Sequence, residues 1–133
     1  MDLLLAPGIL EAVNDHARAA YPNEGCGLLA GRHAAERFIP MRNVSPSAAH
    51  YEMDPAELIR ALRDLRGADD ALIAIYHSHP HGPAQPSTTD VERAYYPEAA
   101  HLIISLADLE RPLAAAFRII AGEVLPIEVR VIV

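Results

Sequence analysis

Two histidines and an aspartate, joined by a proline-rich loop, are the side chains in this sequence most able to do chemistry together. His77 and His79 follow an apolar run, 71–76, and Asp90 comes 11 residues after His79. In an extended segment, residues i and i+2 point to the same side and lie about 6.5 Å apart by strand rise. Their imidazoles can therefore converge on one divalent ion. Two imidazoles and a carboxylate form a three-ligand set, which leaves the fourth position of a catalytic zinc site open for water.

A second carboxylate, Glu24, stands far upstream and is followed by Gly25 and Gly27. A loop acid is usually solvated, and sequence spacing alone does not place this one near the metal. The glycines allow close approach of the backbone to another group, which makes the position worth testing.

Two other interpretations of these residues remain open. His81 continues the alternation of His77 and His79, so an all-histidine site is an alternative, although the adjacent Pro80 and Gly82 indicate that the strand has already ended. Ser87 and Asp90 fit an S-x-x-D pattern, which taken alone favours a helix capping box. The combination of both histidines with Asp90 on the next element favours a metal site over coincidence.

Together these residues resemble the motif of the JAMM (MPN-plus) metalloprotease family. That motif is an upstream Glu, then His-Ser/Thr-His-Pro, six residues, Ser, two residues and Asp. Every fixed position is present here: Glu24, His77-Ser78-His79-Pro80, Ser87 and Asp90. The stretch 24–31 is similar to the short stand-alone bacterial members, and the likeness extends over nearly the whole chain. The larger relatives carry insertions that grip ubiquitin, for which this chain has no room.

The resemblance implies a role for each motif residue. His77, His79 and Asp90 would ligate Zn²⁺, with water in the fourth position. Glu24 would hold that water as general base and pass its proton to the leaving amine, while Ser87 would donate its hydroxyl to the developing oxyanion. Zinc lowers the pKa of bound water toward about 7 and polarises a carbonyl, so no cysteine or serine nucleophile is needed.

The activity implied by the resemblance is hydrolysis of a peptide or isopeptide amide. For the small bacterial members the implied partner is a ubiquitin-like sulfur-carrier protein, cut at its C-terminal Gly-Gly tail. Two other functions are weighed against this. A non-catalytic MPN-type scaffold would not need the metal ligands, and a non-heme iron enzyme with a 2-His-1-carboxylate site would not need Glu24 or Ser87. A zinc deaminase is disfavoured because its signature needs a pair of cysteines.

Composition limits the remaining possibilities. The 133 residues suit a single domain, 1–133, and 51% of them are hydrophobic. The net charge of −7 disfavours nucleic acid as a partner, because phosphate binding needs a basic surface. Cys26 is the only cysteine, so no intrachain disulfide forms, and we expect it to be a small packed residue. With no signal-peptide pattern and no apolar stretch of membrane-spanning length, we expect a cytoplasmic protein. The oligomeric state is not indicated.

Hydrophobic spacing predicts helices and strands in mixed order. We expect helices over 8–20, from Asp54 to Gly67 and over 87–95, and strands over 27–30, 37–41, 51–53, 72–76, 101–106, 113–120 and 124–133. Asp54-Pro55-Ala56-Glu57 is a strong helix start. Pro126 suits an edge or a bulge of the last strand. His16 is expected on a helix surface. The predicted class is α/β (α+β), a mixed, curved β-sheet flanked by helices, as in the MPN/JAMM (cytidine-deaminase-like) architecture.

Overall fold

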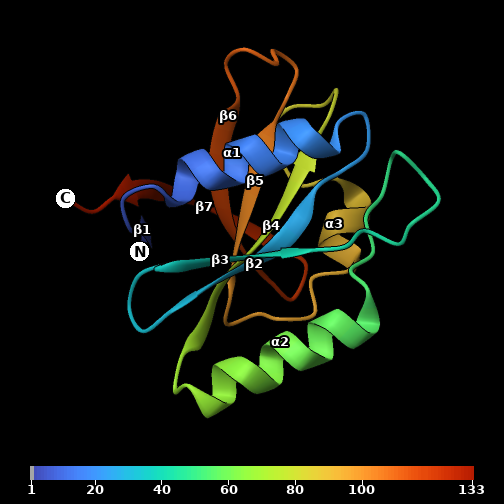
Figure 1. Cartoon of the computed structure of the whole chain (residues 1–133). Coiled ribbons are helices and arrows are strands. Elements are labelled where there is room, and N and C mark those ends of the chain that lie inside the picture. The colour runs from blue at the N-terminus through green and yellow to red at the C-terminus, as the bar shows by residue number, and fades with distance from the viewer. Residues whose placement is uncertain (1) are drawn as a thin grey trace.

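The computed structural model describes residues 2–133, which fold into one curled sheet with helices on both of its faces (Figure 1). The strands are β1 (Asp2–Leu5), β2 (Cys26–Gly31), β3 (Arg37–Met41), β4 (Ala71–His79), β5 (Ala100–Ser105), β6 (Leu113–Ile120) and β7 (Glu123–Val131). The helices are α1 (Ile9–Ala20), α2 (Pro55–Gly67) and α3 (Thr88–Glu92). Within residues 2–133, no helix has the length and apolar character required to cross a membrane.

The sheet is mixed, as the sequence predicts. Its strand order is β1-β7-β6-β5-β4-β2-β3. The pairs β4–β5 and β1–β7 are parallel, and the other neighbouring pairs are antiparallel. The catalytic candidates come from its middle, because β4 carries both histidines and lies between β2 and β5. A central strand is hydrogen-bonded on both sides, so it gives its side chains a rigid base.

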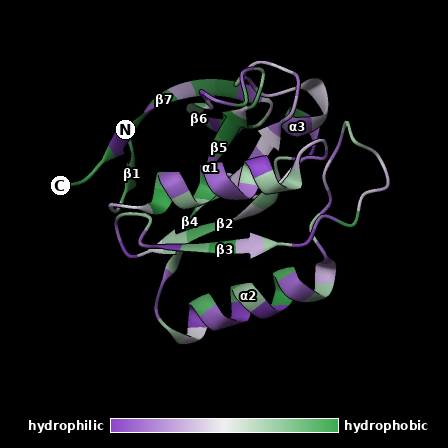
Figure 2. Cartoon of the chain, turned by 45° about the horizontal axis from the view of Figure 1, so that its top comes forward, coloured by the Kyte–Doolittle hydropathy of each residue, from purple (hydrophilic) through white to green (hydrophobic). Residues whose placement is uncertain are grey.

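Alternation along β4 divides the core into two layers. Tyr76 and Ala74 pack with α1 in one hydrophobic cluster, while Ile75 packs with α2 in the other. The helices lie on opposite faces of the sheet, and each mixes polar and apolar residues along its length (Figure 2). Because successive strand residues point to opposite faces, His77 and His79 share the face of Ile75, whereas Ser78 shares the face of Tyr76.

Helix α2 begins as its sequence predicts. The Asp54 carboxylate accepts hydrogen bonds from the backbone N–H groups of Ala56 and Glu57, and Pro55 occupies the first turn. A proline there loses no helical hydrogen bond, because the first N–H groups have no partner within the helix. Ala61 and Leu65 form its buried face.

Several boundaries differ from the prediction. Strand β4 continues through His79 instead of ending at 76, and α3 stops at Glu92 instead of 95. Residues 51–53 are not a strand, since only one isolated bridge, Asn43 to Met53, forms there. The short strand β1 was not predicted from its four residues. It pairs with β7 only over Glu128 to Val131. Pro126 therefore pairs with β6 on one side and has no strand on the other side, as expected for a proline at an open edge.

Candidate metal centre and catalytic site

Three side-chain atoms from β4 and α3 surround one point, where an ion could be bound. His77 Nε2 and His79 Nε2 are 3.1 Å apart, and Asp90 Oδ2 lies 3.1 Å from each of them. Ligand atoms at the corners of a tetrahedron around zinc, with bonds of about 2.0–2.1 Å, are separated by about 3.3 Å. The two predicted histidines and the predicted aspartate therefore form nearly one face of such a tetrahedron, and its fourth corner remains for another ligand.

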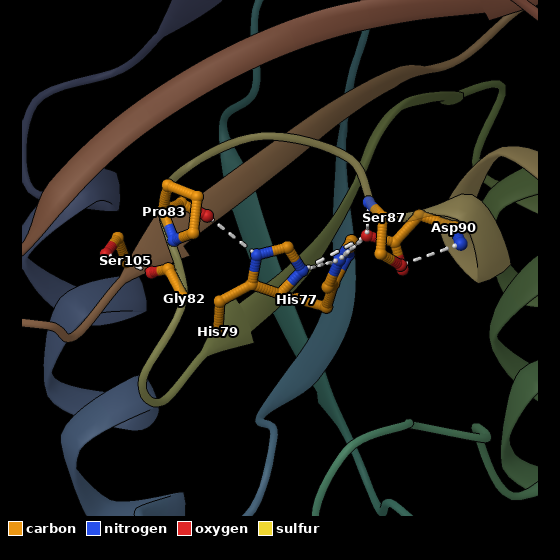
Figure 3. A network of polar contacts seen from close by, with 7 residues as sticks. All are labelled: His77, His79, Gly82, Pro83, Ser87, Asp90 and Ser105. Carbon is orange, nitrogen blue, oxygen red and sulfur yellow. Dashed lines mark hydrogen bonds and ion pairs between the residues drawn. The ribbon is translucent and has the colours of Figure 1, made fainter.

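The loop after β4 fixes the orientation of His79. The Nδ1 of His79 lies 2.8 Å from the backbone carbonyl of Pro83, which can only accept a hydrogen bond (Figure 3). Nδ1 therefore carries the proton and Nε2 presents its lone pair to the shared point. The loop itself is anchored from β5, where the Ser105 hydroxyl donates to the Gly82 carbonyl at 2.6 Å. Such outer contacts orient ligand imidazoles in metal sites.

The capping box and the metal ligand set involve the same aspartate. The Ser87 N–H donates to Asp90 Oδ2 at 2.8 Å, and the Asp90 N–H donates to Ser87 Oγ at 3.1 Å. The capping box is therefore present, and it is compatible with the metal-site interpretation, because the cap aims the Asp90 carboxylate at the histidines. Ser87 Oγ accepts within the cap, so its O–H hydrogen stays available to a bound substrate.

His77 is held by packing. Its side chain is buried, and its ring lies nearly parallel to that of Tyr51, with centroids 4.7 Å apart and 22° between the planes. Its Nδ1 is buried without a hydrogen-bond partner among the described residues. The sequence reasoning did not find Tyr51 as a candidate site residue, because nothing in its spacing links residue 51 to residue 77.

Glu24 is buried although it lies in a loop. Only 5% of the residue is exposed, and its Oε1 has no hydrogen-bond partner in the part of the chain described. Burial raises the pKa of Glu24 to about 7, with His79 lowering it and Asp90 raising it further. A buried carboxylate whose pKa lies near neutrality is suited to take up and release a proton.

Glu24 also lies close enough to be considered as a ligand. One of its carboxylate oxygens and one ring nitrogen each of His77 and His79 lie within 4.8 Å of one another. The Asp90 oxygen lies at hydrogen-bond distance from both imidazoles, 3.1 Å in each case. This contact favours Asp90 as the third ligand, and Glu24 then remains close by as a candidate base for a water molecule.

The charges of the three candidate ligands suit a cation. Burial would raise the pKa of Asp90, but hydrogen bonds with His77 and His79 hold it well below its usual range. Burial lowers the pKa of His77 despite the nearby Asp90. For His79, burial is outweighed by hydrogen bonds to Asp90 and Pro83, and the pKa is raised. The lowered pKa of Asp90 keeps its carboxylate ionised, so the three side chains offer a cation one negative charge and two ring nitrogens.

A cleft of about 490 Å³ opens beside these residues. It is lined by Glu24, Ala48, Ala49, His79, Ser87 and members of the 80–86 loop. Most of these loop residues are prolines or glycine, which carry little side-chain bulk. The backbone of an extended peptide could therefore approach the site closely. Glu24 and Ser87 therefore line the same cleft.

Other candidates from the sequence lie outside the cluster. His81 is exposed and packs edge-on against Tyr21, so it is not part of the histidine pair. Cys26 is buried, and burial raises the pKa of its thiol to about 12, as expected of a packed residue rather than a nucleophile. His16 was expected on the surface, but it is half-buried and lies 3.1 Å from the Tyr76 hydroxyl.

Comparison with known proteins identifies similar sequences. Residues 7–119 match the family model described as prokaryotic homologs of the JAB domain. The CysO-cysteine peptidase of Mycobacterium tuberculosis is 37% identical over 125 residues, which cover 92% of this chain and 86% of that protein. The probable TtuB-protein conjugate cleaving protease of Thermus thermophilus is 46% identical over 93 residues, covering 69% of this chain and 63% of that protein.

Solved structures show the same fold. Protein DSY2949 from Desulfitobacterium hafniense superimposes with a TM-score of 0.88 at 37% identity, covering 98% of this chain and 92% of that one. AF2198, a JAB1/MPN domain protein from Archaeoglobus fulgidus, gives a TM-score of 0.64 at 21% identity, covering 97% and 98%. The predicted MPN-type mixed sheet with flanking helices is confirmed.

Proposed function

Because the chain belongs to the family of prokaryotic JAB-domain homologs, we propose that it is a zinc-dependent peptidase that cuts the C-terminal tail of a ubiquitin-like sulfur-carrier protein. The peptidase class expected from the motif is confirmed by relatives that bear peptidase and protease names. The zinc, the roles of individual residues and the substrate are the proposed parts. The observation that carries them is the convergence of His77, His79 and Asp90 beside a buried Glu24.

The donor set fits zinc. Two imidazole nitrogens and one carboxylate oxygen at mutual distances of 3.1 Å suit a tetrahedral ion, and the hydrogen bond of His79 Nδ1 to Pro83 presents the correct nitrogen. When bound, zinc would lower the pKa of a coordinated water and polarise the scissile carbonyl. Ferrous iron accepts similar ligands, but a buried base and a free serine hydroxyl beside the site favour hydrolysis.

The chain's own groups then divide the work of amide hydrolysis. Glu24, as carboxylate, takes a proton from the attacking water, because its buried oxygen has no competing partner in the described chain. The Ser87 hydroxyl donates to the oxygen of the tetrahedral intermediate. Protonated Glu24 then gives its proton to the leaving amine. A pKa near neutrality makes both transfers accessible to the same carboxyl group.

The shape of the cleft favours an extended tail over a folded loop. The cleft is lined by Ala48, Ala49 and the loop 80–86, and β4 ends beside it. Glycines in a substrate would let its backbone come close to the metal-binding atoms. One relative is named for a CysO-cysteine substrate and another for TtuB-protein conjugates. We propose a carrier tail ending in Gly-Gly, cut after the second glycine.

A cytoplasmic location of the protein stays a prediction.

The test is cleavage of a carrier protein that has a short C-terminal extension after Gly-Gly, followed by mass spectrometry. We expect a product that ends in Gly-Gly, formed only with metal present. Replacing the final glycine by valine should slow the reaction sharply, because a branched side chain prevents close approach. If the valine substrate is cut equally fast, or if only carrier-free peptides are cut, the carrier substrate is wrong and a general metallopeptidase remains.

A further inference from the structure

The peptide bond between Glu24 and Gly25 is held by side chains at both of its polar atoms. Asn43 Nδ2 donates to the Glu24 carbonyl at 2.9 Å, and the Gly25 N–H donates to Ser78 Oγ at 2.8 Å. Strand β2 begins at Cys26, and backbone pairing with β4 reaches one residue further, where the Gly25 carbonyl accepts from the Ser78 N–H at 3.0 Å. The Glu24 carbonyl and the Gly25 N–H lie beyond this pairing and are held by the two side chains.

A second layer supports Ser78 from the α1 face of the sheet. The Tyr76 side chain lies on the same face of β4 as Ser78, and its hydroxyl is 3.1 Å from His16 Nδ1. A Cβ added to Gly25 would come within 2.5 Å of the same hydroxyl. The glycine backbone thus lies directly against Tyr76, which explains why no side chain fits beside Glu24 at this position.

Asn43 connects the Glu24–Gly25 peptide to the segment that contains Tyr51. Its Oδ1 accepts hydrogen bonds from the N–H groups of Ser45, at 2.9 Å, and Glu52, at 3.0 Å. Glu52 follows Tyr51, whose ring stacks on His77. One amide side chain therefore connects the backbone of the proposed base to the segment that packs on a proposed ligand.

We propose that Asn43 and Ser78 are positioning residues for Glu24, and this inference rests on the proposed function. The Glu24 Oε1 atom has no hydrogen-bond partner among the described residues, so contacts of its own do not fix that end of the carboxylate. Its place beside the histidines is instead set by the peptide plane from which the side chain extends. Misplacing a catalytic group by about 1 Å can cost about 100-fold in rate.

The test compares Asn43→Ala and Ser78→Ala with Asp54→Ala, which removes the side-chain cap of α2 and leaves both hydrogen bonds of the Glu24–Gly25 peptide in place. We expect kcat to fall by about 10- to 100-fold in the first two variants, with KM and zinc content unchanged. Asp54→Ala should lower the melting temperature without changing kcat. Ser78→Thr, which keeps the hydroxyl, should restore kcat toward wild type.

Amide hydrogen exchange supplies a readout that does not depend on activity. The Gly25 N–H should exchange faster in Ser78→Ala than in wild type, and Asp54→Ala should leave it unchanged. An active wild type whose Asn43→Ala and Ser78→Ala variants keep the wild-type kcat would overturn the positioning role alone. Unchanged Gly25 exchange in Ser78→Ala would also overturn it. A wild type that cleaves neither carrier nor peptide would overturn the proposed function and this inference with it.

Discussion

The Tyr51 ring stacks on the imidazole of His77, with ring centroids 4.7 Å apart. His77 Nδ1 has no hydrogen-bond partner among the residues described, whereas His79 Nδ1 has the Pro83 carbonyl. The two proposed ligands are therefore oriented by different means, His79 by a hydrogen bond and His77 by an aromatic neighbour.

Tyr51→Ala should weaken zinc binding about tenfold, the lower end of the loss seen when an outer-shell partner of a ligand is removed. The ring of His77 would gain freedom to turn away from the shared point. Tyr51→Phe keeps the stacked ring and should bind zinc as wild type does. Competition with a chromogenic chelator measures both. Equal affinities in the alanine and phenylalanine variants would show that stacking does not orient the ligand.

The proposed ligand set predicts that loss of His77 and loss of His81 have different effects on zinc content. His77→Ala and Asp90→Ala should each lose most of the bound zinc, because each removes one of three ligands. His81→Ala should keep about one zinc per chain, because its ring packs on Tyr21 outside the cluster. Elemental analysis of the purified variants measures the content. Zinc lost from the His81 variant but kept by the Asp90 variant would reverse the assignment.

Ser87→Ala should retain zinc and lose rate by about 10²–10³-fold, the usual effect of removing one oxyanion donor. The same change removes the cap of α3, which should lower the free energy of unfolding by about 1 kcal/mol. Ser87→Thr keeps a hydroxyl for both roles and should be nearly normal in rate and stability. Kinetics and chemical unfolding separate the two effects. A wild-type rate in Ser87→Ala would exclude the oxyanion role.

His101 should make the metal-free protein sensitive to mild acid. Burial lowers its pKa from the ordinary 6.5 to about 4, helped by the nearby His77. Below pH 6.5 the unfolded chain takes up a proton that the folded chain refuses. The contribution of His101 to stability is therefore complete above that pH and is lost by about pH 4, by up to about 3 kcal/mol. His101→Leu removes this contribution, so stability should fall less between pH 7 and pH 4.5 than in wild type, as urea unfolding at the two pH values would show. An identical pH dependence in both proteins would contradict it.

The sequence predicts much of this fold because its strongest signals are local. The Asp54 cap, the apolar spacing of α1 and α2 and the paired histidines of β4 each depend on residues close together in the chain. Strand β1 was missed because four residues, Asp2–Leu5, carry too little pattern, and its partner β7 lies at the other end of the sequence. Helix α3 was predicted too long because its capping box marks a beginning but nothing local marks its end at Glu92.

In the candidate site, too, local spacing was predictive and long-range contacts were not. The spacing of His77, His79 and Asp90 already predicts a metal centre, whereas the catalytic role of Glu24 came only from the resemblance. Tyr51 and Asn43 were not found, because their roles depend on contacts across the sheet edge and the loop 43–53. His16 was misplaced for a related reason, since its partner Tyr76 is 60 residues away. Long-range contacts of this kind leave no mark in local spacing.

The central claim is that Asp90 completes the metal site and Glu24 acts on the water beside it. Glu24→Gln tests this most directly, because the amide fills the same space but cannot take up the proton. The account predicts that zinc content and melting temperature stay at wild-type values while cleavage of the carrier substrate is nearly abolished. A Glu24→Gln protein that loses its zinc would make Glu24 a ligand. One that keeps zinc and turns over at the wild-type rate would remove it from the mechanism.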